Sequence, residues 1–407
     1  MKNIAALTIC SINYLAKALV LIDSYSTHHP NHAFYLVLVD RKRDRVDINR
    51  PNVTVIWVED LDIKNFLKYA FTFDVIEFNT NVKPASLQLI LKSHDAVVYL
   101  DPDTKVYAPL EAVFESLETA SIVVTPHSNT PILDGKKPDD LELLKFGAFN
   151  LGFIGISHCA EGFAFLEWWS ARCMEYGFYE PQLGLGVDQK WVGLAPCYFP
   201  GLQILHDSGL NVAFWNLHER NLTHKDGVWM INGKHPLKFI HFSSFNPNTP
   251  DDIAQKQTRF EPLSRPDFSH LAREYAAELI ANASDKFSNT PYGFDYFDDG
   301  RYVTPALRRF YASLKNNYLG SDENPFKSNG IVMKFAKKNG LLIRGNQKSK
   351  RHTFRDMNSY GLQIFIINKI LRFVLFLFGP EKYVNLMRYL AHISSLRNQT
   401  DMFGSLK

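Results

Sequence analysis

The chain has 407 residues, which is too long for one minimal domain and predicts about two or three folding units. Apolar residues make up 46% and charged residues 21% of the chain. This composition is globular and excludes a wholly disordered protein. The formal net charge of +3 argues against a protein built mainly to neutralise the phosphates of a nucleic acid.

Cysteine usage indicates a reducing compartment. The chain contains four cysteines, Cys10, Cys159, Cys173 and Cys197, and no C-x-x-C pair. Neither a disulfide scaffold nor a thiolate zinc site is expected, so we predict a cytoplasmic location. The first apolar run contains polar residues and predicts a core strand that enters a helix, not a cleavable signal. No uninterrupted run of about 18 apolar residues occurs, so no membrane-spanning helix is predicted.

Short apolar runs alternate with helical patterns in the first 125 residues. Strands are predicted at Ile4–Cys10, 34–39, 53–58 and Ala96–Leu100. Helices are predicted at 14–28, 62–70 and 84–92. This alternation predicts βαβ units, and therefore an α/β fold whose central sheet is mostly parallel and covered on both faces.

The later part of the chain is divided by composition. A strand at 149–156 and a helix at 163–176 are followed by short strands, with a tight turn predicted at Asn232-Gly233. Four prolines between 246 and 266 indicate a boundary. We therefore predict an α/β catalytic domain at 1–250, a connective helical extension at 251–325 and a basic, amphipathic helical tail at 326–407.

Two carboxylates follow the strand Ala96–Leu100. Asp101 and Asp103 lie one residue apart at its carboxyl end, the edge at which open parallel sheets bind ligands. Hard oxygen ligands of this kind suit Mg²⁺ or Mn²⁺, and such an ion suits a diphosphate substrate. The alternative interpretation is an ordinary acidic turn.

A phosphatase of the haloacid-dehalogenase type is a competing interpretation, since that family uses D-x-D-x-[TV] after a strand. Lys105 occupies the last motif position here. The motif also follows roughly the fourth predicted strand, not the first. The phosphatase interpretation is therefore disfavoured.

Six ordered stretches make residues 4–245 resemble a GT-A-fold glycosyltransferase. The pattern is closest to the glycogenin-like, family-8-type enzymes and their bacterial relatives that build polysaccharides and other cell-surface glycans. The stretches are residues 8–15, 82–84, 99–103, 149–153, 188–189 and 241–245. The lysine-rich segment that often follows the late histidine in this family is absent, because Asn246-Pro-Asn-Thr-Pro250 stands there.

The resemblance implies a metal site and a donor site. Asp101, Asp103 and His241 would hold Mn²⁺ or Mg²⁺, although a lone histidine at a strand end is often structural. The first strand and its loop would hold the nucleotide base and ribose through Thr8, Ser11, Asn13 and Tyr14. Lys83, Asp101 and Gly152 would lie beside the diphosphate and the donor sugar, with a merely solvated lysine as the alternative for Lys83.

The resemblance also implies three residues near the reaction centre. Asn150 and Asp188 would bond sugar hydroxyls, and Gln189 would lie beside the attacked carbon. For Asp188 the alternative is a helix N-cap. Two aromatic segments carry no assigned chemistry: Trp168-Trp169 is interpreted as core packing, and residues 211–218 as either an acceptor cleft or a core strand. No role is assigned to residues 290–310.

The resulting hypothesis is a metal-dependent transferase that moves a sugar from a nucleotide-diphospho-sugar, expected to be a UDP-sugar, to a glycan or lipid-linked acceptor. Resemblance favours retention of configuration. The alternative is a non-catalytic glycan-binding or scaffold protein. A nucleotidyltransferase is disfavoured, because residues 11–14 lack a glycine- and basic-rich loop.

The tail combines basic and apolar segments. Residues 327–355 contain nine Lys or Arg and no Asp or Glu, 362–378 are mostly apolar, and 383–393 are amphipathic. This pattern favours peripheral attachment to an anionic membrane, at the inner face of the plasma membrane. The alternative is a helical pair that packs on the catalytic domain or on another subunit.

Overall fold

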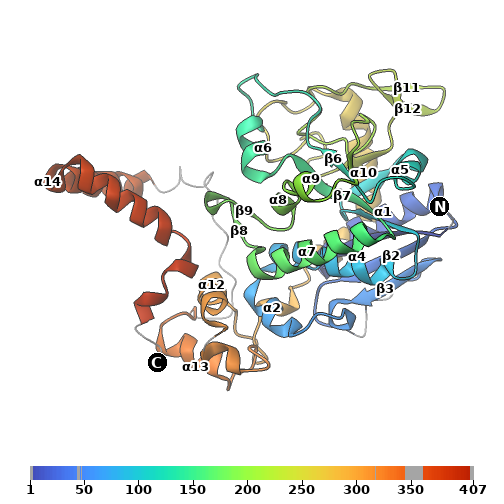
Figure 1. Cartoon of the computed structure of the whole chain (residues 1–407). Coiled ribbons are helices and arrows are strands. Elements are labelled where there is room, and N and C mark those ends of the chain that lie inside the picture. Colours follow the sequence, from blue (N-terminus) through green and yellow to red (C-terminus); the bar gives the residue numbers. More distant parts are fainter. Residues whose placement is uncertain (1–2, 44–45, 47, 317, 344–360, 404–407) are drawn as a thin grey trace. The chain divides into compact units, whose positions relative to one another are not determined.

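Figure 1 shows the computed structural model of the chain, which describes every residue except 1–2, 44–45, 47, 317, 344–360 and 404–407. Its contacts divide the chain into two units. One comprises residues 1–66 and 75–293, and the other comprises 67–74 and 294–407. The predicted boundaries at 250 and 325 do not coincide with this division, since residues 251–293 belong to the first unit.

A seven-stranded sheet forms the centre of the first unit. Its order is β10-β6-β7-β4-β1-β2-β3, with β1 (Ile4–Cys10), β2 (Ala33–Leu38), β3 (Val53–Trp57), β4 (Ala96–Leu100), β6 (Ile122–Pro126), β7 (Phe149–Ser157) and β10 (Leu202–Ile204). All neighbours are parallel except β7, which is antiparallel to both β4 and β6. The predicted α/β fold with a mostly parallel sheet is confirmed.

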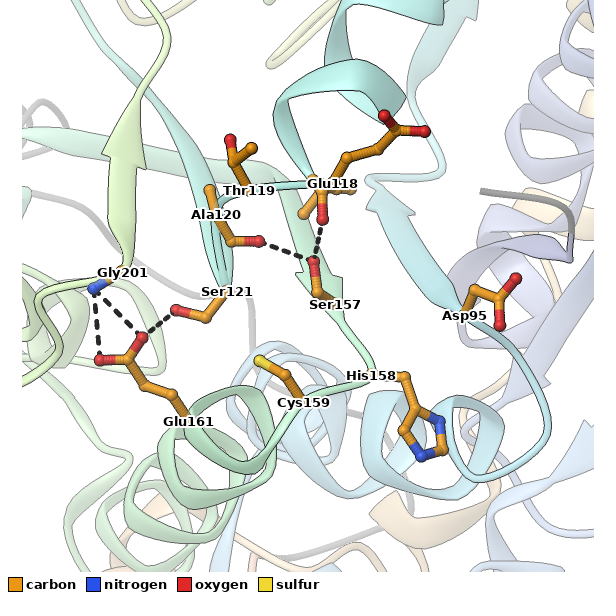
Figure 2. A pocket seen from close by; sticks show the side chains of 11 residues that line it. Asp95, Glu118, Thr119, Ala120, Ser121, Ser157, His158, Cys159, Glu161 and Gly201 are labelled. Carbon is orange, nitrogen blue, oxygen red and sulfur yellow. Dashed lines mark hydrogen bonds between the residues drawn. The ribbon is translucent and has the colours of Figure 1, made fainter.

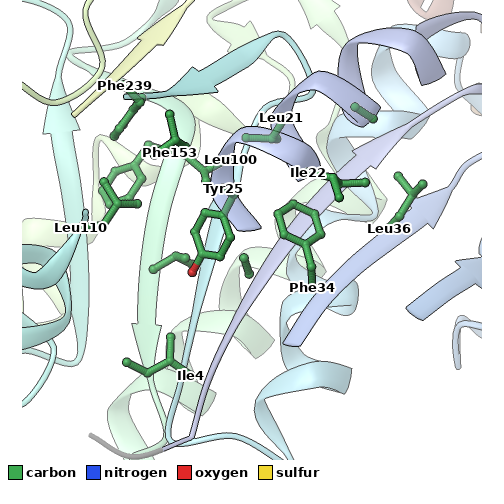
Figure 3. Close-up of a cluster of buried hydrophobic side chains, with 14 of the residues drawn as sticks. Ile4, Leu21, Ile22, Tyr25, Phe34, Leu36, Leu100, Leu110, Phe153 and Phe239 are labelled. Atoms are coloured by element: carbon green, nitrogen blue, oxygen red, sulfur yellow. The ribbon is translucent and has the colours of Figure 1, made fainter. Parts of the chain in front are cut away.

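Helices cover both faces of this sheet. On one face, α1 (Leu15–His28) contributes Leu21, Ile22 and Tyr25 to a buried cluster with Phe34 and Leu36 of β2 (Figure 3). The alternate side chains of β1 point to the other face and are buried too. On that side α4 (Lys83–Leu91) contacts β1, β4, β7 and α7 (Ala160–Tyr176). Trp169 of α7 is fully buried, which confirms the predicted packing role.

Apart from α10 (Pro266–Ala281), the remaining elements of the first unit are short. The first unit also contains α3 (Val75–Asn81), α5 (Glu111–Ser116), α6 (Asp140–Phe146), α8 (Gln189–Val192), α9 (Ala195–Tyr198), α11 (Ser284–Ser288), β5 (Thr104–Val106), β8 (Tyr179–Glu180), β9 (Leu185–Gly186), β11 (Leu222–Lys225), β12 (Val228–Ile231), β13 (His235–Pro236) and β14 (Phe239–His241). Between β12 and β13, Asn232 and Gly233 have φ of 53° and 67°, which confirms the predicted tight turn.

The second unit is helical. It contains α12 (Pro305–Leu314), α13 (Ile331–Lys338), α14 (Gly361–Ile393) and most of α2 (Phe66–Thr72). The buried Arg308 donates hydrogen bonds to the carbonyls of Ala70, Phe71 and Phe73 and to Asp295. This guanidinium therefore ties segment 67–74 into the unit.

Helix α14 meets a test of length and composition that the sequence prediction did not apply. It is long and apolar enough, by length and composition alone, to cross a membrane, whereas no spanning helix was predicted. The prediction required an uninterrupted apolar run, and Lys369 and Arg372 interrupt this one without lowering its mean hydropathy below 1.8. Of the predicted basic segment 327–355, residues 344–355 lie outside the described residues.

A buried histidine follows α1. His29 Nε2 accepts a hydrogen bond from the Leu110 amide at 3.1 Å, and its ring stacks on His32 with centroids 4.9 Å apart. Burial, followed by the neighbouring His32 and His28, lowers the pKa of His29 to about 4. The folded chain therefore holds His29 neutral over a pH range in which the unfolded chain protonates it.

We expect this site to destabilise the protein as the pH falls from about 6.5 toward 4, because the unfolded state then binds the extra proton. The variant His29→Gln keeps an acceptor for Leu110 and does not titrate. Relative to this variant, the wild type should lose roughly 1–2 kcal/mol of unfolding free energy over that range. Unfolding of both proteins across the pH series measures the effect, and a pH-independent difference between them would contradict it.

Candidate metal and donor site

Two carboxylates are held in a tight turn after β4. The Asp101 amide donates to the Gly152 carbonyl of β7, and the Thr104 amide donates to the Asp101 carbonyl. The side chain of Asp103 is 12% exposed and that of Asp101 is 28% exposed. The turn therefore presents one carboxylate from inside the protein and one at its edge.

His241 reaches the pair from a distant part of the sequence. Strand β14 pairs antiparallel with β5, which places His241 opposite Thr104. Its Nε2 lies 3.1 Å from Asp103 Oδ1 and 3.6 Å from Asp101 Oδ2, and one ligand atom from each residue lies within 4.8 Å of the others. The three residues predicted to share a cation therefore do meet.

The charged groups of the triad shift one another's pKa. Burial opposes ionisation of Asp103, but the charge and hydrogen bond of His241, with Lys17, hold its pKa well below the usual range. Burial likewise opposes protonation of His241, yet Asp103 and then Asp101 raise its pKa. The pocket thus favours positive charge between the carboxylates, which a proton or a metal cation can supply.

Asn150 sets the tautomer of His241. Its Oδ1 accepts hydrogen bonds from the Gly152 amide and from Asn211 Nδ2, both at 3.0 Å. Because this oxygen is an acceptor, His241 Nδ1, at 3.2 Å, must donate to it. The lone pair of His241 is thereby left on Nε2, facing the carboxylates, as a metal ligand requires.

The orientation of Asn150 is fixed in turn by His127. Asn150 Nδ2 donates to His127 Nε2 at 3.2 Å, so that nitrogen must be unprotonated. Burial lowers the pKa of His127 to about 4, which keeps the ring neutral. The indole of Trp215 packs edge-on against both His127 and His241. Residues 211–217 are all buried, with Trp215 behind the triad, and none of them lies in a strand.

Gly152 occupies its position for a steric reason. A Cβ at this residue would lie 2.4 Å from the Cε1 and Nδ1 atoms of His241 and 2.7 Å from Asn150 Oδ1. Only a glycine allows the imidazole to pack against β7 at this distance. The expected contact of Gly152 with a donor sugar stays a prediction.

Lys83 and Asp188 form a buried pair beside the triad. Lys83 Nζ lies 2.7 Å from Asp188 Oδ2, donates to the Leu151 carbonyl at 2.8 Å, and lies 3.9 Å from Asp101 Oδ1. Asp188 precedes α8 but its side chain makes no capping hydrogen bond. Because of this missing hydrogen bond, the capping alternative does not hold. Burial raises the pKa of Asp188, and the positive charge of Lys83 opposes that rise.

Gln189 is bound at both ends of its amide. Its Oε1 accepts from the Leu151 amide at 3.0 Å, and its Nε2 donates to the Phe146 carbonyl at 2.9 Å. The Asp188 carbonyl accepts from Trp169 Nε1 at 2.9 Å. Both predicted reaction-centre residues are therefore anchored to neighbouring elements.

The predicted nucleotide-binding residues lie at the carboxyl end of β1. Thr8 is fully buried, and among the described residues its hydroxyl has no hydrogen-bond partner. Ser11 Oγ donates to Asn13 Oδ1 at 2.5 Å, whereas Tyr14 is 43% exposed. An exposed aromatic ring beside a polar loop can stack on a base.

Sequence reasoning missed three residues of this site. Lys17 Nζ lies over the Tyr14 ring at 4.3 Å and 3.8 Å from Asp103 Oδ2. The Tyr99 hydroxyl donates to Asp101 Oδ1 at 2.5 Å. Two available signals were overlooked: Lys17 follows Tyr14 by about one helical turn, and His127 directly follows β6, as Asp101 follows β4.

A cavity of about 530 Å³ lies elsewhere. It is lined by Asp95 and His158, at the end of β4 opposite to Asp101. Figure 2 shows that its polar groups bond within the protein: Glu161 accepts from the Gly201 amide and Ser121, and Ser157 Oγ donates to the carbonyls of Leu117 and Ala120. Since these groups are satisfied, we assign the cavity no chemistry.

The chain is similar to several known proteins. No protein-family model matches it. It is 28% identical over 254 residues to the curated "Uncharacterized protein YfnF" of Bacillus subtilis (strain 168), a match that covers 61% of this chain and 84% of that protein.

Solved structures of glycosyltransferases are also similar to the chain. The galactosyltransferase LgtC, solved with donor and acceptor sugar analogues, matches with 16% identity and a TM-score of 0.43, over 71% of this chain and 97% of LgtC. The glycosyltransferase GlyE of Streptococcus pneumoniae TIGR4 matches with 14% identity and a TM-score of 0.41, over 73% of this chain and 67% of GlyE.

We expect Gly152→Ala to weaken binding of Mn²⁺ roughly 10–100-fold, because the added methyl displaces the His241 ring from the triad. Calorimetric titration of the purified chain with Mn²⁺ measures this affinity without requiring turnover. Gly361→Ala is a matched control, since a Cβ there meets nothing within 4 Å. Unchanged affinity in Gly152→Ala would contradict the role assigned to this contact.

Proposed function

We propose that the chain is a metal-dependent glycosyltransferase that moves a sugar from a UDP-sugar to a glycan or lipid-linked acceptor. The main support is the triad of Asp101, Asp103 and His241, whose oxygen and imidazole donors suit Mn²⁺ or Mg²⁺. The triad follows β4 at the carboxyl edge of the sheet, where open α/β sheets bind ligands. A module that only binds glycans has no need of this donor set.

Two lysines lie beside the triad, and we assign them different roles. A divalent ion in the triad would act as a Lewis acid on the departing diphosphate. Lys17 and Lys83 lie 3.8 and 3.9 Å from the carboxylates, where an accessible lysine can stabilise negative charge that develops. The Lys17 side chain is 17% exposed and that of Lys83 is 2% exposed. We therefore assign Lys17 to the diphosphate and Lys83 to the ordering of Asp188.

The donor would lie over the first strand, with its base on Tyr14 and its ribose near Thr8, Ser11 and Asn13. In a transfer with retention, the acceptor oxygen bonds to the anomeric carbon as the carbon–oxygen bond to the diphosphate breaks. The proton of the acceptor hydroxyl passes to an oxygen of the leaving phosphate. The described residues leave this scheme without a separate protein base, in keeping with the family that the motifs resemble.

Asn150, Asp188 and Gln189 act in this proposal by positioning other groups. Asn150 orients His241, Asp188 holds Lys83, and Gln189 ties β7 to α8. Asn150 and Gln189 already use both ends of their amides within the protein. Contact of either amide with a sugar would therefore compete with a protein hydrogen bond.

We expect the purified chain to hydrolyse a UDP-sugar slowly in the presence of Mn²⁺ and not after chelation of the metal. Asp103→Asn should lower this turnover more than about 100-fold, because it removes a metal-binding charge. Its melting temperature without metal should fall little, since Asp103 lies in the turn between β4 and β5 and is no part of the apolar core.

Asp226→Asn is the matched control. Asp226 lies in an exposed turn with φ of 51°, a conformation that Asn tolerates. A panel of nucleotide-sugars identifies the donor. Donor binding without metal-dependent turnover in the presence of acceptors would instead favour the scaffold alternative.

We also propose a cytoplasmic location. Cys10, Cys159, Cys173 and Cys197 are all free thiols, which suits a reducing compartment. Nucleotide-sugar donors and an acceptor on the inner face of the plasma membrane would then both be accessible.

A further inference from the structure

Helix α14 exposes apolar side chains over its whole length. None of its most apolar 18-residue window is buried, and the mean hydropathy of that window is 1.8. Phe376, Leu362 and Phe373 are 88%, 71% and 63% exposed. A surface of this kind in water is a binding surface for an apolar partner.

Charges in the middle of the helix argue against a membrane span. Residues 361–378 would extend about 27 Å, close to the thickness of a bilayer core. Lys369 and Arg372 are the ninth and twelfth of these 18 residues. A span would therefore place both near the bilayer centre, where charged side chains are most unfavourable.

The polar side chains instead form stripes along the helix. Asn368 and Lys369 lie on the same side as Arg372, at spacings of four and three residues. In the second half, Asn385, Arg388 and His392 recur at helical spacing. The apolar side chains Ile367, Ile370, Val374 and Leu377 lie opposite the first stripe, whereas Phe376, four residues after Arg372, lies on the side of the stripe.

A break in α14 allows the two polar stripes to face the same side. In one continuous helix the 16 residues from Arg372 to Arg388 would turn the second stripe roughly half a turn from the first. The helix is interrupted at Gly379, whose φ of 78° and ψ of 167° are not helical, and Pro380 follows. The interruption frees the second half to turn its stripe toward the same side as the first.

We propose that α14 lies in the plane of an anionic lipid bilayer as two consecutive amphipathic helices, with its basic stripes toward the headgroups and its apolar faces among the acyl chains. Lys369, Arg372, Lys382 and Arg388 against Glu381 leave a net charge of four minus one, or +3, which complements anionic headgroups. This inference goes beyond the proposed transfer reaction and does not rest on it.

The test is flotation of the full chain with lipid vesicles. The chain should bind vesicles of phosphatidylcholine and phosphatidylglycerol in equal parts, and bind phosphatidylcholine vesicles much more weakly. The double variant Lys369→Gln, Arg372→Gln should lower affinity for the anionic vesicles roughly 30-fold, because two basic contacts are lost. Alkaline carbonate should release the bound chain, since a helix in the interface is not anchored as a span is.

The matched control is Lys225→Gln, Lys234→Gln, which removes the same charge from exposed positions in β11 and in the turn between β12 and β13 and should bind as the wild type does. Equal binding to both vesicle types, or an unaffected stripe variant, would overturn the proposal. Retention through the carbonate wash would replace it with a spanning helix. A chain that ignores both vesicles, whether as a monomer or paired with a second copy through α14, would also refute it.

Discussion

The close approach of His241 to Asp101 and Asp103 is the constraint on which the rest of the first unit depends. Two carboxylates at the edge of a buried turn repel one another unless positive charge lies between them. Asp103 and Asp101 raise the pKa of His241, so a proton on Nε2 or a divalent ion can supply that charge. Proton and cation would therefore compete for Nε2.

Antiparallel β7 connects this constraint to the sheet. It lies directly beside β4 and carries both Asn150, which orients His241, and Gly152, which leaves room for its ring. A parallel strand at this place would bring the opposite end of its sequence to the site. The one reversal in the sheet thus puts the supporting residues next to the carboxylates that they serve.

Two lysines near the site differ in their burial, and therefore in whether they can contact a ligand. Lys83 is fully enclosed by Asp188, Leu151 and the Tyr99 ring, so its charge is committed to the protein. Lys17 projects from the first turns of α1 and remains partly exposed. Under the proposed function, Lys17 would supply the positive charge that the resemblance places in a lysine-rich segment after His241.

The amino-acid sequence by itself determined the elements and the ligand types. Strand and helix periods predicted β1, β4 and β7 nearly to the residue, and the strand before Asp101 indicated the functional edge, because these signals are local. Only the tertiary structure decided which polar groups are available. Asn150 and Asp188, predicted to bond sugar hydroxyls, and Gln189, predicted beside the attacked carbon, also hold His241, Lys83 and Leu151 within the protein. Their contacts with a sugar stay predictions, and Lys17 was missed. Contacts between residues far apart in the chain decide such assignments, because burial and pairing depend on neighbours that no local pattern records.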